Sequence, residues 1–417
     1  MGENRIGVYS ALPGGGTSIR VGTLWSGGNR GRETARFEYD SAWIAHPQGY
    51  ALEPALPLVR GVQFTPRGLF GSMADSAPDR WGRTLMKRAE AARARVEGVP
   101  PRRLSEADYL LRVNDEARQG ALRYSLDGGA SFMDNDAARA VPPLVELRRL
   151  QHAVDSTVED NATDEDLRLL LAPGSSLGGA WPKACVRDER GRLCIAKFSR
   201  VDQEYDVVAW EAAALRLAGA AGLNVPPFRL ETLQVGGKRR HVLLVEKFDR
   251  GAAGERIPYI SAMTMLDAGD GDRRSYLELV QGMLQHCIRP RRDLPELWRR
   301  VAFSLMVSNT DDHLRNHGFL RLQPGGWTLS PLFDVNPPPP DVSPRVLTTP
   351  LTPDGGDATR AALLECAGQF YLRAREAGEA WRQIERAVAG WRTVAAEYRI
   401  PKRERERMAA AFAPVMP

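Results

Sequence analysis

Four short apolar runs and one helical stretch between residues 184 and 248 constrain the fold of this chain most. Branched and aromatic residues separated by turn residues predict strands at residues 184–186, 193–198, 228–234 and 241–248. Between the second and third strands, residues 204–221 are rich in Ala, Leu and Glu. They end at Gly222 before Pro226, which predicts a helix and its stop. The pattern indicates a small β-rich lobe.

The regions on either side of this lobe differ from it. Residues 5–39 predict β-hairpins, and residues 79–94 and a stretch opening at Ser105 predict helices. Pro142 and Pro143 indicate a linker, followed by a helical stretch at 144–154. From Tyr276 onward the periodicity is mostly helical, except at 327–329 and at four prolines, 337–340, which we expect to form a stiff extended linker.

We therefore predict an α+β chain of three parts. These are an N-terminal mixed α/β domain at 1–143, a β-rich lobe with a Gly-rich loop at 144–248, and a mainly helical C-terminal lobe at 249–417. The last two parts together would form one bilobal unit.

Composition excludes several classes of protein. With 43% hydrophobic and 26% charged residues in 417, the chain is neither disordered nor fibrous. A net charge of +5 permits an anionic partner but is small for a dedicated nucleic-acid binder. No run of 18 uncharged apolar residues predicts a membrane anchor. We expect a cytoplasmic protein whose four cysteines, too widely spaced for a zinc motif, are reduced: Cys185, Cys194, Cys287 and Cys366.

Asp311 and Asn316 form the most specific local pattern. They lie five positions apart, the spacing of a kinase catalytic loop. In such a loop the carboxylate accepts the proton of a nucleophilic hydroxyl and the amide oxygen holds a magnesium ion. A polar turn after a helix also produces this spacing by chance, so the interpretation depends on the neighbouring motifs.

Asp334 follows this loop across a predicted hairpin. A carboxylate in that place could hold magnesium beside the same phosphates, as the metal-binding Asp of kinases does. The usual Asp-Phe-Gly is replaced here by Asp334-Val335-Asn336. The alternative is that Asp334 only caps the turn before the four prolines.

Lys197 ends an apolar strand, where a buried cation needs an anion beside it. A nucleotide phosphate would be such an anion. Glu211 lies fourteen residues later on the predicted helix and could pair with this lysine, and Glu204 is a competing candidate. The alternative is that the Lys197 ammonium reaches solvent and that the helix face carrying the glutamates is also solvated.

A Gly-rich segment at 173–183 precedes the strand of Lys197. Its glycines would let backbone N–H groups approach phosphates, although Gly-Lys-Ser/Thr is missing, so it is not a Walker A loop. Residues 174–178 also spell Gly-x-Ser-x-Gly, the pattern of a hydrolase nucleophile. That nucleophile needs a strand before it and a helix after it, whereas here a helical stretch precedes and Pro182 and a strand follow. A plain glycine turn remains an alternative.

The other charged or histidine-containing segments do not form a specific functional motif. His313 and His317 are four apart, but no Glu follows the first His, so a zinc protease is not indicated. Residues 402–407 alternate in charge and are typical of a solvated helix face. Residues 289–292 could contact phosphate or an acidic partner, without any nucleic-acid-binding motif beside them.

Taken together, five elements stand in kinase order: Gly-rich loop, strand lysine, helix glutamate, catalytic loop and metal aspartate. The sequence resembles the HipA family, the bacterial protein kinase toxins of type II toxin–antitoxin modules. The segments that carry the resemblance are residues 70–83 and 113–122 near the N-terminus, and 178–183, 211–226, 245–250, 309–316 and 333–335 further on.

The resemblance implies a protein-kinase-like bilobal unit that uses ATP and magnesium. Asp311 would be the catalytic base, and Asn316 and Asp334 would hold the metal. Lys197, paired with Glu211, would contact the phosphates. The other residues that it implies at the nucleotide are Gly178, Gly179, Ala180, Lys183, Glu246, Lys247, Phe248 and His313. Glu246 and Phe248 would offer backbone groups to adenine.

The resemblance also implies regulation and partners. Ser176, or the adjacent Ser175, would be autophosphorylated in the Gly-rich loop, and the added charge would repel ATP phosphates. A HipB-like helix-turn-helix antitoxin would bind the chain, and DNA would be contacted only through that antitoxin. The substrate would be a translation protein such as an aminoacyl-tRNA synthetase. Two alternatives stay open: a small-molecule or lipid kinase, and a catalytically silent antitoxin-binding co-repressor.

Overall fold

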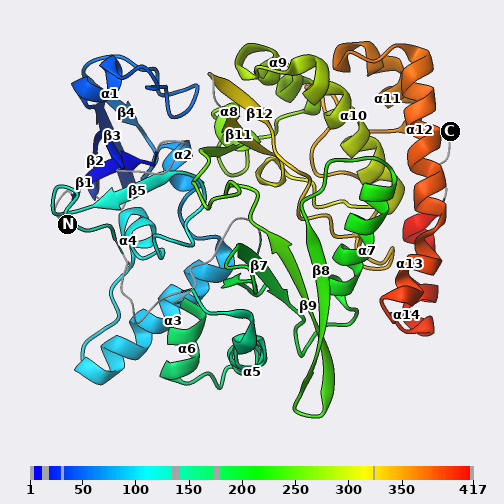
Figure 1. Cartoon of the computed structure of the whole chain (residues 1–417), viewed down its shortest axis with the longest axis horizontal. Coiled ribbons are helices and arrows are strands. Elements are labelled where there is room, and N and C mark those ends of the chain that lie inside the picture. The colour runs from blue at the N-terminus through cyan, green and yellow to red at the C-terminus, as the bar shows by residue number, and fades with distance from the viewer. Residues whose placement is uncertain are drawn as a thin grey trace.

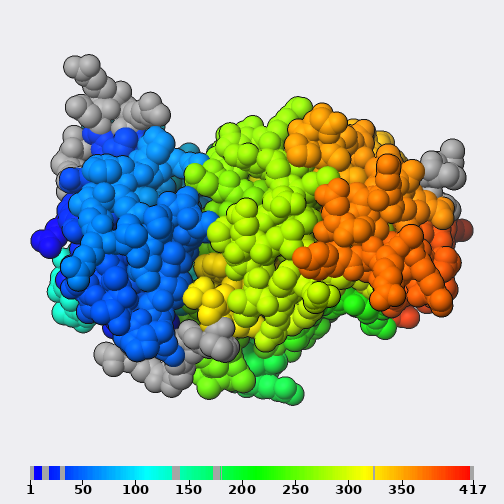
Figure 2. All heavy atoms as spheres, turned by 90° about the horizontal axis from the view of Figure 1, so that it is seen from above, coloured from blue at the N-terminus to red at the C-terminus, as the bar shows by residue number. Residues whose placement is uncertain are grey.

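The computed structural model describes residues 4–11, 18–29, 32–133, 141–171, 179, 181–322 and 325–413. Seen from above, the N-terminal part lies at one end of the long axis of the molecule and the last helices of the chain lie at the other (Figure 2).

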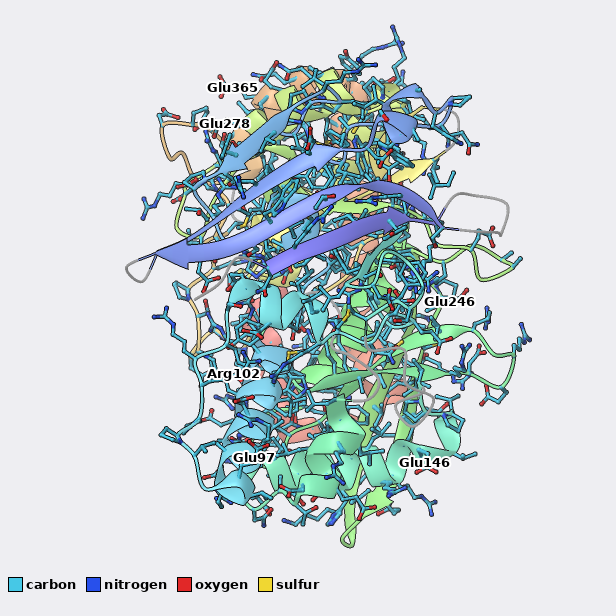
Figure 3. The ribbon with its side chains drawn as sticks, turned by 90° about the vertical axis from the view of Figure 1, so that its left-hand side faces the viewer. Glu97, Arg102, Glu146, Glu246, Glu278 and Glu365 are labelled. Carbon is cyan, nitrogen blue, oxygen red and sulfur yellow. The ribbon has the colours of Figure 1, made fainter. Side chains whose placement is uncertain are left out.

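The N-terminal part holds a five-stranded antiparallel sheet in the order β4-β3-β2-β1-β5. Its strands are β1 (Asn4–Ser10), β2 (Ile19–Asn29), β3 (Arg32–Tyr39), β4 (Val62–Thr65) and β5 (Leu122–Ser125). Its helices are α1 (Ser41–Ala45), α2 (Gly71–Ala74), α3 (Arg80–Glu97) and α4 (Glu106–Leu111). Figure 3 looks onto this sheet and shows Glu97, at the end of α3, at the same end of the molecule as Glu146.

Local sequence explains where these helices begin. Asp79 precedes α3, and its Oδ1 accepts a hydrogen bond of 2.8 Å from the Gly82 N–H, which satisfies one free donor of the first turn. α4 begins with a capping box, in which Ser105 and Asp108 each bond the other's backbone N–H. Both helices lie where the sequence predicts them.

The central part holds a four-stranded antiparallel sheet in the order β6-β7-β9-β8. Its strands are β6 (Lys183–Arg187), β7 (Leu193–Phe198), β8 (Phe228–Val235) and β9 (Lys238–Glu246). One face packs against α3, α5 (Leu147–Val158) and α6 (Asp164–Leu171), and the other against α7 (Val207–Ala220) (Figure 1). A 3-10 turn, Leu144–Glu146, leads into α5.

The C-terminal part is mainly helical. It comprises α8 (Ala262–Met265), α9 (Tyr276–His286), α10 (Pro290–Val307), α11 (Arg360–Glu365), α12 (Ala374–Ala389), α13 (Trp391–Glu397) and α14 (Lys402–Arg407), with 3-10 turns at Leu314–Asn316, Cys366–Phe370 and Ala409–Phe412. A small sheet of β10 (Tyr259–Ser261), β11 (Gly318–Leu322) and β12 (Gly326–Leu329) lies among these helices. In the described part of the chain, no helix is long and apolar enough to cross a membrane.

One apolar core joins the three parts. Its side chains come from the N-terminal sheet, from α7 and from the C-terminal helices. Trp43, Trp210 and Trp298, one from each part, are fully buried in it. Burial of such large side chains in a shared core favours packing of the parts as one body.

Several sequence expectations need correction. The helix expected from residue 204 begins at Val207, because the Asp206 carboxylate accepts a bond of 3.1 Å from Ala209 N and caps it. Strands β10 and β11 were not predicted, since they are short and lack clear alternation. The four prolines expected to form a stiff extended linker lie outside any helix or strand, and the prolines at 337–339 are buried, so their rings pack inside the protein.

Candidate active site

Three charged side chains meet between the four-stranded sheet and the C-terminal helices. The Lys197 ammonium on β7 lies 2.6 Å from Glu211 Oε1 on α7 and 2.6 Å from Asp334 Oδ1. Burial alone would lower the pKa of Lys197, but the two carboxylates raise it above its usual value. Burial would raise the pKa of Asp334, but Lys197 holds it well below its usual value. Lys197 is therefore charged and Asp334 ionised.

The competing candidate, Glu204, lies elsewhere. Its carboxylate is 2.8 Å from the Arg407 guanidinium, and the Glu204 side chain is 73% exposed. Glu211 is thus the glutamate that the fold brings to Lys197, because it lies on the buried side of α7.

The segment of Asp334 is tied to the catalytic-loop segment. Asn336 N donates to Asn309 Oδ1 at 2.9 Å, and Asn336 Nδ2 donates to Asp334 Oδ1 at 3.3 Å. Asp334 itself has a φ of 60°, a left-handed conformation that Asp adopts more readily than most residues. These bonds fix the direction of its carboxylate.

Asp311 and Asn316 follow α10, which ends at Val307 with Ser308 in the left-handed conformation. The Asp311 side chain is 71% exposed, so a substrate can reach it. Asn316 Nδ2 donates to the Asp311 carbonyl at 2.7 Å, which sets the orientation of the Asn316 amide. The Asn316 Oδ1 atom is buried and has no hydrogen-bond partner among the described residues.

This pair of oxygens suits a magnesium ion. A buried amide oxygen without a donor among the described residues and an ionised carboxylate are both hard oxygen ligands of the kind that Mg²⁺ prefers. Asn316 Oδ1 and the Asp334 carboxylate are therefore the atoms that would hold it.

A buried hydrogen-bond network holds Asp312, within the predicted catalytic loop. The Tyr276 hydroxyl on α9 donates to Asp312 Oδ2 and lies 3.3 Å from His317 Nε2. Thr349 N donates to Asp312 Oδ1 at 3.3 Å, and Thr349 Oγ1 donates to the Asp312 carbonyl at 2.8 Å. Burial raises the pKa of Asp312 to about 7 and lowers the pKa of His317 to about 3.

His313, another residue that the family resemblance places at the nucleotide, lies beside Asp311. Its Nε2 is 3.9 Å from Asp311 Oδ1.

A pocket opens beside Lys197 and Glu211. Its apolar lining comes from Ile195, Val245, Phe248 and Phe333. Phe248 and Phe333 stack at a tilt, with ring centroids 5.4 Å apart. Apolar walls with a few polar groups at one end are typical of a site for a flat heterocycle with a charged tail.

Residues 246–248 link the sheet to the helical part and line the same pocket. Lys247 N donates to the Leu193 carbonyl and Glu246 N donates to the Pro227 carbonyl, both at 2.9 Å. Because Pro227 has no N–H, it cannot return a hydrogen bond to the Glu246 carbonyl. The two backbone bonds hold residues 246–247 beside the pocket, which suits the predicted role of Glu246 and Phe248 in binding a base.

Lys183 lies at the start of β6 and is almost wholly buried. Its ammonium is 2.7 Å from Asp79 Oδ2 of the N-terminal part. In the β6–β7 ladder Lys183 stands directly opposite Lys197. Gly179 is exposed with a φ of +77°. Residues 173–178 and 180 of the predicted loop lie outside the described residues, and among them are the predicted site residues Ser175, Ser176, Gly178 and Ala180.

Sequence reasoning missed several residues of this region. Asp79, Asp312 and Tyr276 were not singled out, and neither was Gln119, which also lines the pocket. Asp79 lies in one of the segments that carry the family resemblance, which was the only signal for it. Tyr276 and Gln119 are brought to the site by packing between distant segments.

Comparisons with known proteins agree with this architecture. A solved structure of HipA from Shewanella oneidensis MR-1, in complex with HipB and its operator DNA, matches with a TM-score of 0.65 and 17% identity, over 98% of this chain and 95% of that one. This similarity confirms the predicted α+β fold with a kinase-like bilobal unit.

A curated relative from Haemophilus influenzae, described as a putative kinase, is 27% identical over 218 residues. The match covers 45% of this chain and 61% of that relative, so it spans less than two thirds of the relative's length. The family model for the HipA N-terminal domain matches residues 17–124, and the model for the HipA-like C-terminal domain matches residues 175–391. Because the second match alone covers more than half of the sequence, the chain belongs to the HipA family.

Proposed function

We propose that this chain is an ATP- and magnesium-dependent kinase that phosphorylates serine or threonine hydroxyls of a protein. The observation that carries the proposal is the meeting of Lys197 with Glu211 and Asp334, near the exposed Asp311 and the unpartnered Asn316 Oδ1. The name of the Haemophilus relative supports kinase activity.

Each residue has a defined task in this reaction. Lys197, held by Glu211, would neutralise charge on the phosphates of ATP. Asn316 Oδ1 and Asp334 would hold magnesium, which neutralises charge that develops on the transferred group. Asp311 would accept the proton of the attacking hydroxyl while that oxygen bonds to the γ-phosphorus and ADP leaves.

We further propose that the chain is the toxin of a HipA/HipB-like module. The Shewanella HipA was solved with HipB and operator DNA, which supports a HipB-like partner of the helix-turn-helix type and DNA contact through it. By the family resemblance, the substrate would be a translation protein such as an aminoacyl-tRNA synthetase. Ser176, or Ser175, would be autophosphorylated.

The test is incubation of the purified protein with γ-labelled ATP and magnesium. Asp311→Asn should abolish transfer of label and leave ATP binding intact, because only the proton acceptor is lost. Asp160→Asn is the matched control, since the Asp160 side chain is 88% exposed and pairs with a surface arginine. Mass spectrometry of the peptide 174–183 would locate label on Ser176 or Ser175.

The outcomes separate the alternatives. Full activity of Asp311→Asn would contradict its role as the base. Magnesium-dependent ATP binding with transfer only to a metabolite would favour a small-molecule or lipid kinase. If the wild-type protein binds no ATP with magnesium, the kinase proposal fails and the silent co-repressor is favoured.

A further inference from the structure

The N-terminal part of the chain reaches into the pocket beside Lys197. Gln119, in the segment 114–120 between α4 and β5, is 8% exposed and lines the pocket. Its Oε1 accepts a hydrogen bond of 3.0 Å from Lys247 Nζ. An ammonium is a donor only, so this contact assigns the oxygen of Gln119 to Lys247 and leaves the amide N–H groups facing elsewhere.

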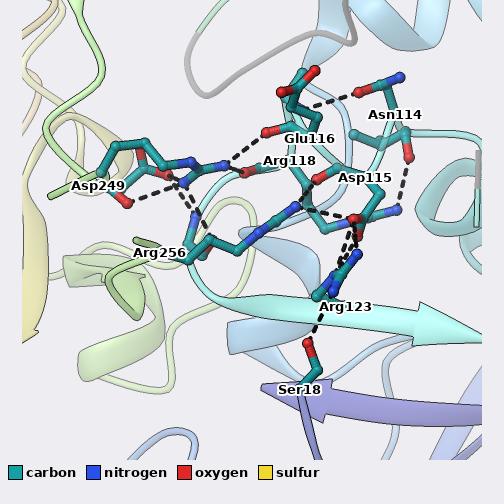
Figure 4. Close-up of polar contacts among 12 residues, drawn as sticks. Ser18, Asn114, Asp115, Glu116, Arg118, Arg123, Asp249 and Arg256 are labelled. Atoms are coloured by element: carbon teal, nitrogen blue, oxygen red, sulfur yellow. Dashed lines mark hydrogen bonds and ion pairs between the residues drawn. The ribbon is translucent and has the colours of Figure 1, made fainter. Parts of the chain in front are cut away.

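The backbone around Gln119 is fixed by buried charges. Gly120 N donates to Asp249 Oδ2 at 2.7 Å, and Arg250 donates to the Glu116 and Arg118 carbonyls, each at 2.8 Å (Figure 4). Figure 4 shows residues 114–118 lying against Asp249 and Arg256, from the segment that follows β9.

Glycine is required at position 120. Its φ is +74°, and a Cβ there would lie 3.3 Å from Tyr259 N. Residues 114–120 therefore lie close to Tyr259 of β10. Gln119 is therefore held by its neighbours on both sides.

Lys247 holds the Gln119 side chain in turn. The Lys247 side chain is 1% exposed, and its ammonium lies 3.3 Å from Asp249 Oδ1 as well as 3.0 Å from Gln119 Oε1. Within the described part of the chain, the hydrogen bond of the Gln119 side chain is the one that its Oε1 accepts from Lys247. The amide N–H groups of Gln119 are therefore available to a ligand in the pocket that this residue lines.

We propose that Gln119 is a nucleotide-binding residue, whose amide N–H donates to an acceptor on the adenosine end of the nucleotide. The N-terminal part thus forms one wall of the nucleotide site and contributes to its affinity. This inference rests on the proposed function, because it requires that the pocket binds a nucleotide. It adds a contact from a region that lies outside the two lobes of the kinase-like unit.

The test is the affinity of purified full-length protein for ADP and for adenosine, measured by calorimetry. Gln119→Met keeps the shape and removes the donors, so both affinities should fall by the same factor, about threefold to tenfold, the worth of one neutral hydrogen bond. Gln119→Glu keeps an acceptor for Lys247 and also lacks the amide donors. It should therefore lower the affinity for both ligands too. Gln63→Met is the control, because Gln63 lies on β4 of the N-terminal sheet and donates to the Pro57 carbonyl at the protein surface.

The outcomes are distinguishable. Wild-type protein that binds neither ligand would overturn the proposed function itself. Wild-type protein that binds both, with unchanged affinity in Gln119→Met and Gln119→Glu, would overturn the inference alone. A loss for ADP without a loss for adenosine would also overturn it, since the contact would then lie at the phosphates. Unchanged melting of the ligand-free variants, with a smaller shift on adding ADP, would support it.

Discussion

Replacing Asp312 by Asn should stabilise the protein above neutral pH and change its stability little in acid. The Asp312 carboxyl is buried, and its hydrogen-bond partners Tyr276 and Thr349 carry no charge. Burial without a cation raises its pKa to about 7. An Asn amide resembles the protonated acid in shape and carries no charge at any pH.

The magnitude follows from the difference between the folded and unfolded pKa values. An unfolded Asp titrates near pH 3.9, so the difference is about 3 pH units, or about 4 kcal/mol at 1.36 kcal/mol per unit. Because the folded pKa is the higher one, the stabilisation by the bound proton is complete below about pH 4 and is lost as the pH rises through about 7. His317 has its pKa lowered to about 3, so its contribution has the opposite sign and is lost as the pH falls below about 6.5. Both proteins contain His317, and its contribution therefore cancels in their difference.

The assay is urea denaturation of Asp312→Asn and wild type at several values between about pH 4 and about pH 8. The free energy of unfolding of the variant minus that of wild type should rise by about 4 kcal/mol across this range. A difference that does not change with pH would refute the reasoning, because it would mean that the Asp312 carboxyl titrates alike in the folded and unfolded chain.

Three further substitutions test other parts of the structure. Glu211→Ala should lower phosphoryl transfer in the labelled-ATP assay by roughly 100-fold, because Lys197 loses one of its two positioning carboxylates. Glu204→Ala should leave transfer unchanged, since Glu204 pairs with Arg407 instead. Equal activity of the two variants would contradict this prediction. Asn316→Ala should raise the magnesium concentration for half-maximal transfer by at least about tenfold, and an unchanged requirement would remove Asn316 from the metal site. Trp298→Ala should lower the free energy of unfolding in urea by about 3–5 kcal/mol, because the indole is fully buried; a much smaller loss would mean that the core closes around the gap.

Local patterns made much of the fold predictable from the sequence. α3 and α4 begin at Asp79 and Ser105 because a short polar side chain next to a helical stretch satisfies its free N–H groups. The pairing of Lys197 with Glu211 could be predicted because both residues lie in strongly patterned elements that are adjacent in sequence. The start of α7 was misplaced by three residues because the cap at Asp206 was not recognised.

Contacts between distant segments could not be predicted in the same way. Gln119 meets Lys247, and Tyr276 meets Asp312, only after the chain has packed, and no periodicity marks either pair. Short strands such as β10 obtain their hydrogen bonds from β11 rather than from a propensity of their own.

The lysine pair of the central sheet shows why the N-terminal part belongs to the candidate site. Lys183 and Lys197 stand directly opposite each other on β6 and β7, where two like charges destabilise a sheet unless each is neutralised. Glu211 and Asp334 neutralise Lys197, while Asp79 of the N-terminal part lies 2.7 Å from the buried Lys183 ammonium.

Asp79 has a second structural task, since its other oxygen caps α3, whose Trp81 and Leu85 pack against the same sheet. The cap and the ion pair therefore both come from Asp79, at the start of the helix whose apolar side chains contact the sheet. Removing the N-terminal part would leave Lys183 without the Asp79 carboxylate, next to the lysine proposed to bind the phosphates, and a buried charge that loses a carboxylate partner costs about 3–5 kcal/mol. The N-terminal part of this chain thus supplies a buried carboxylate to the lysine that stands opposite Lys197.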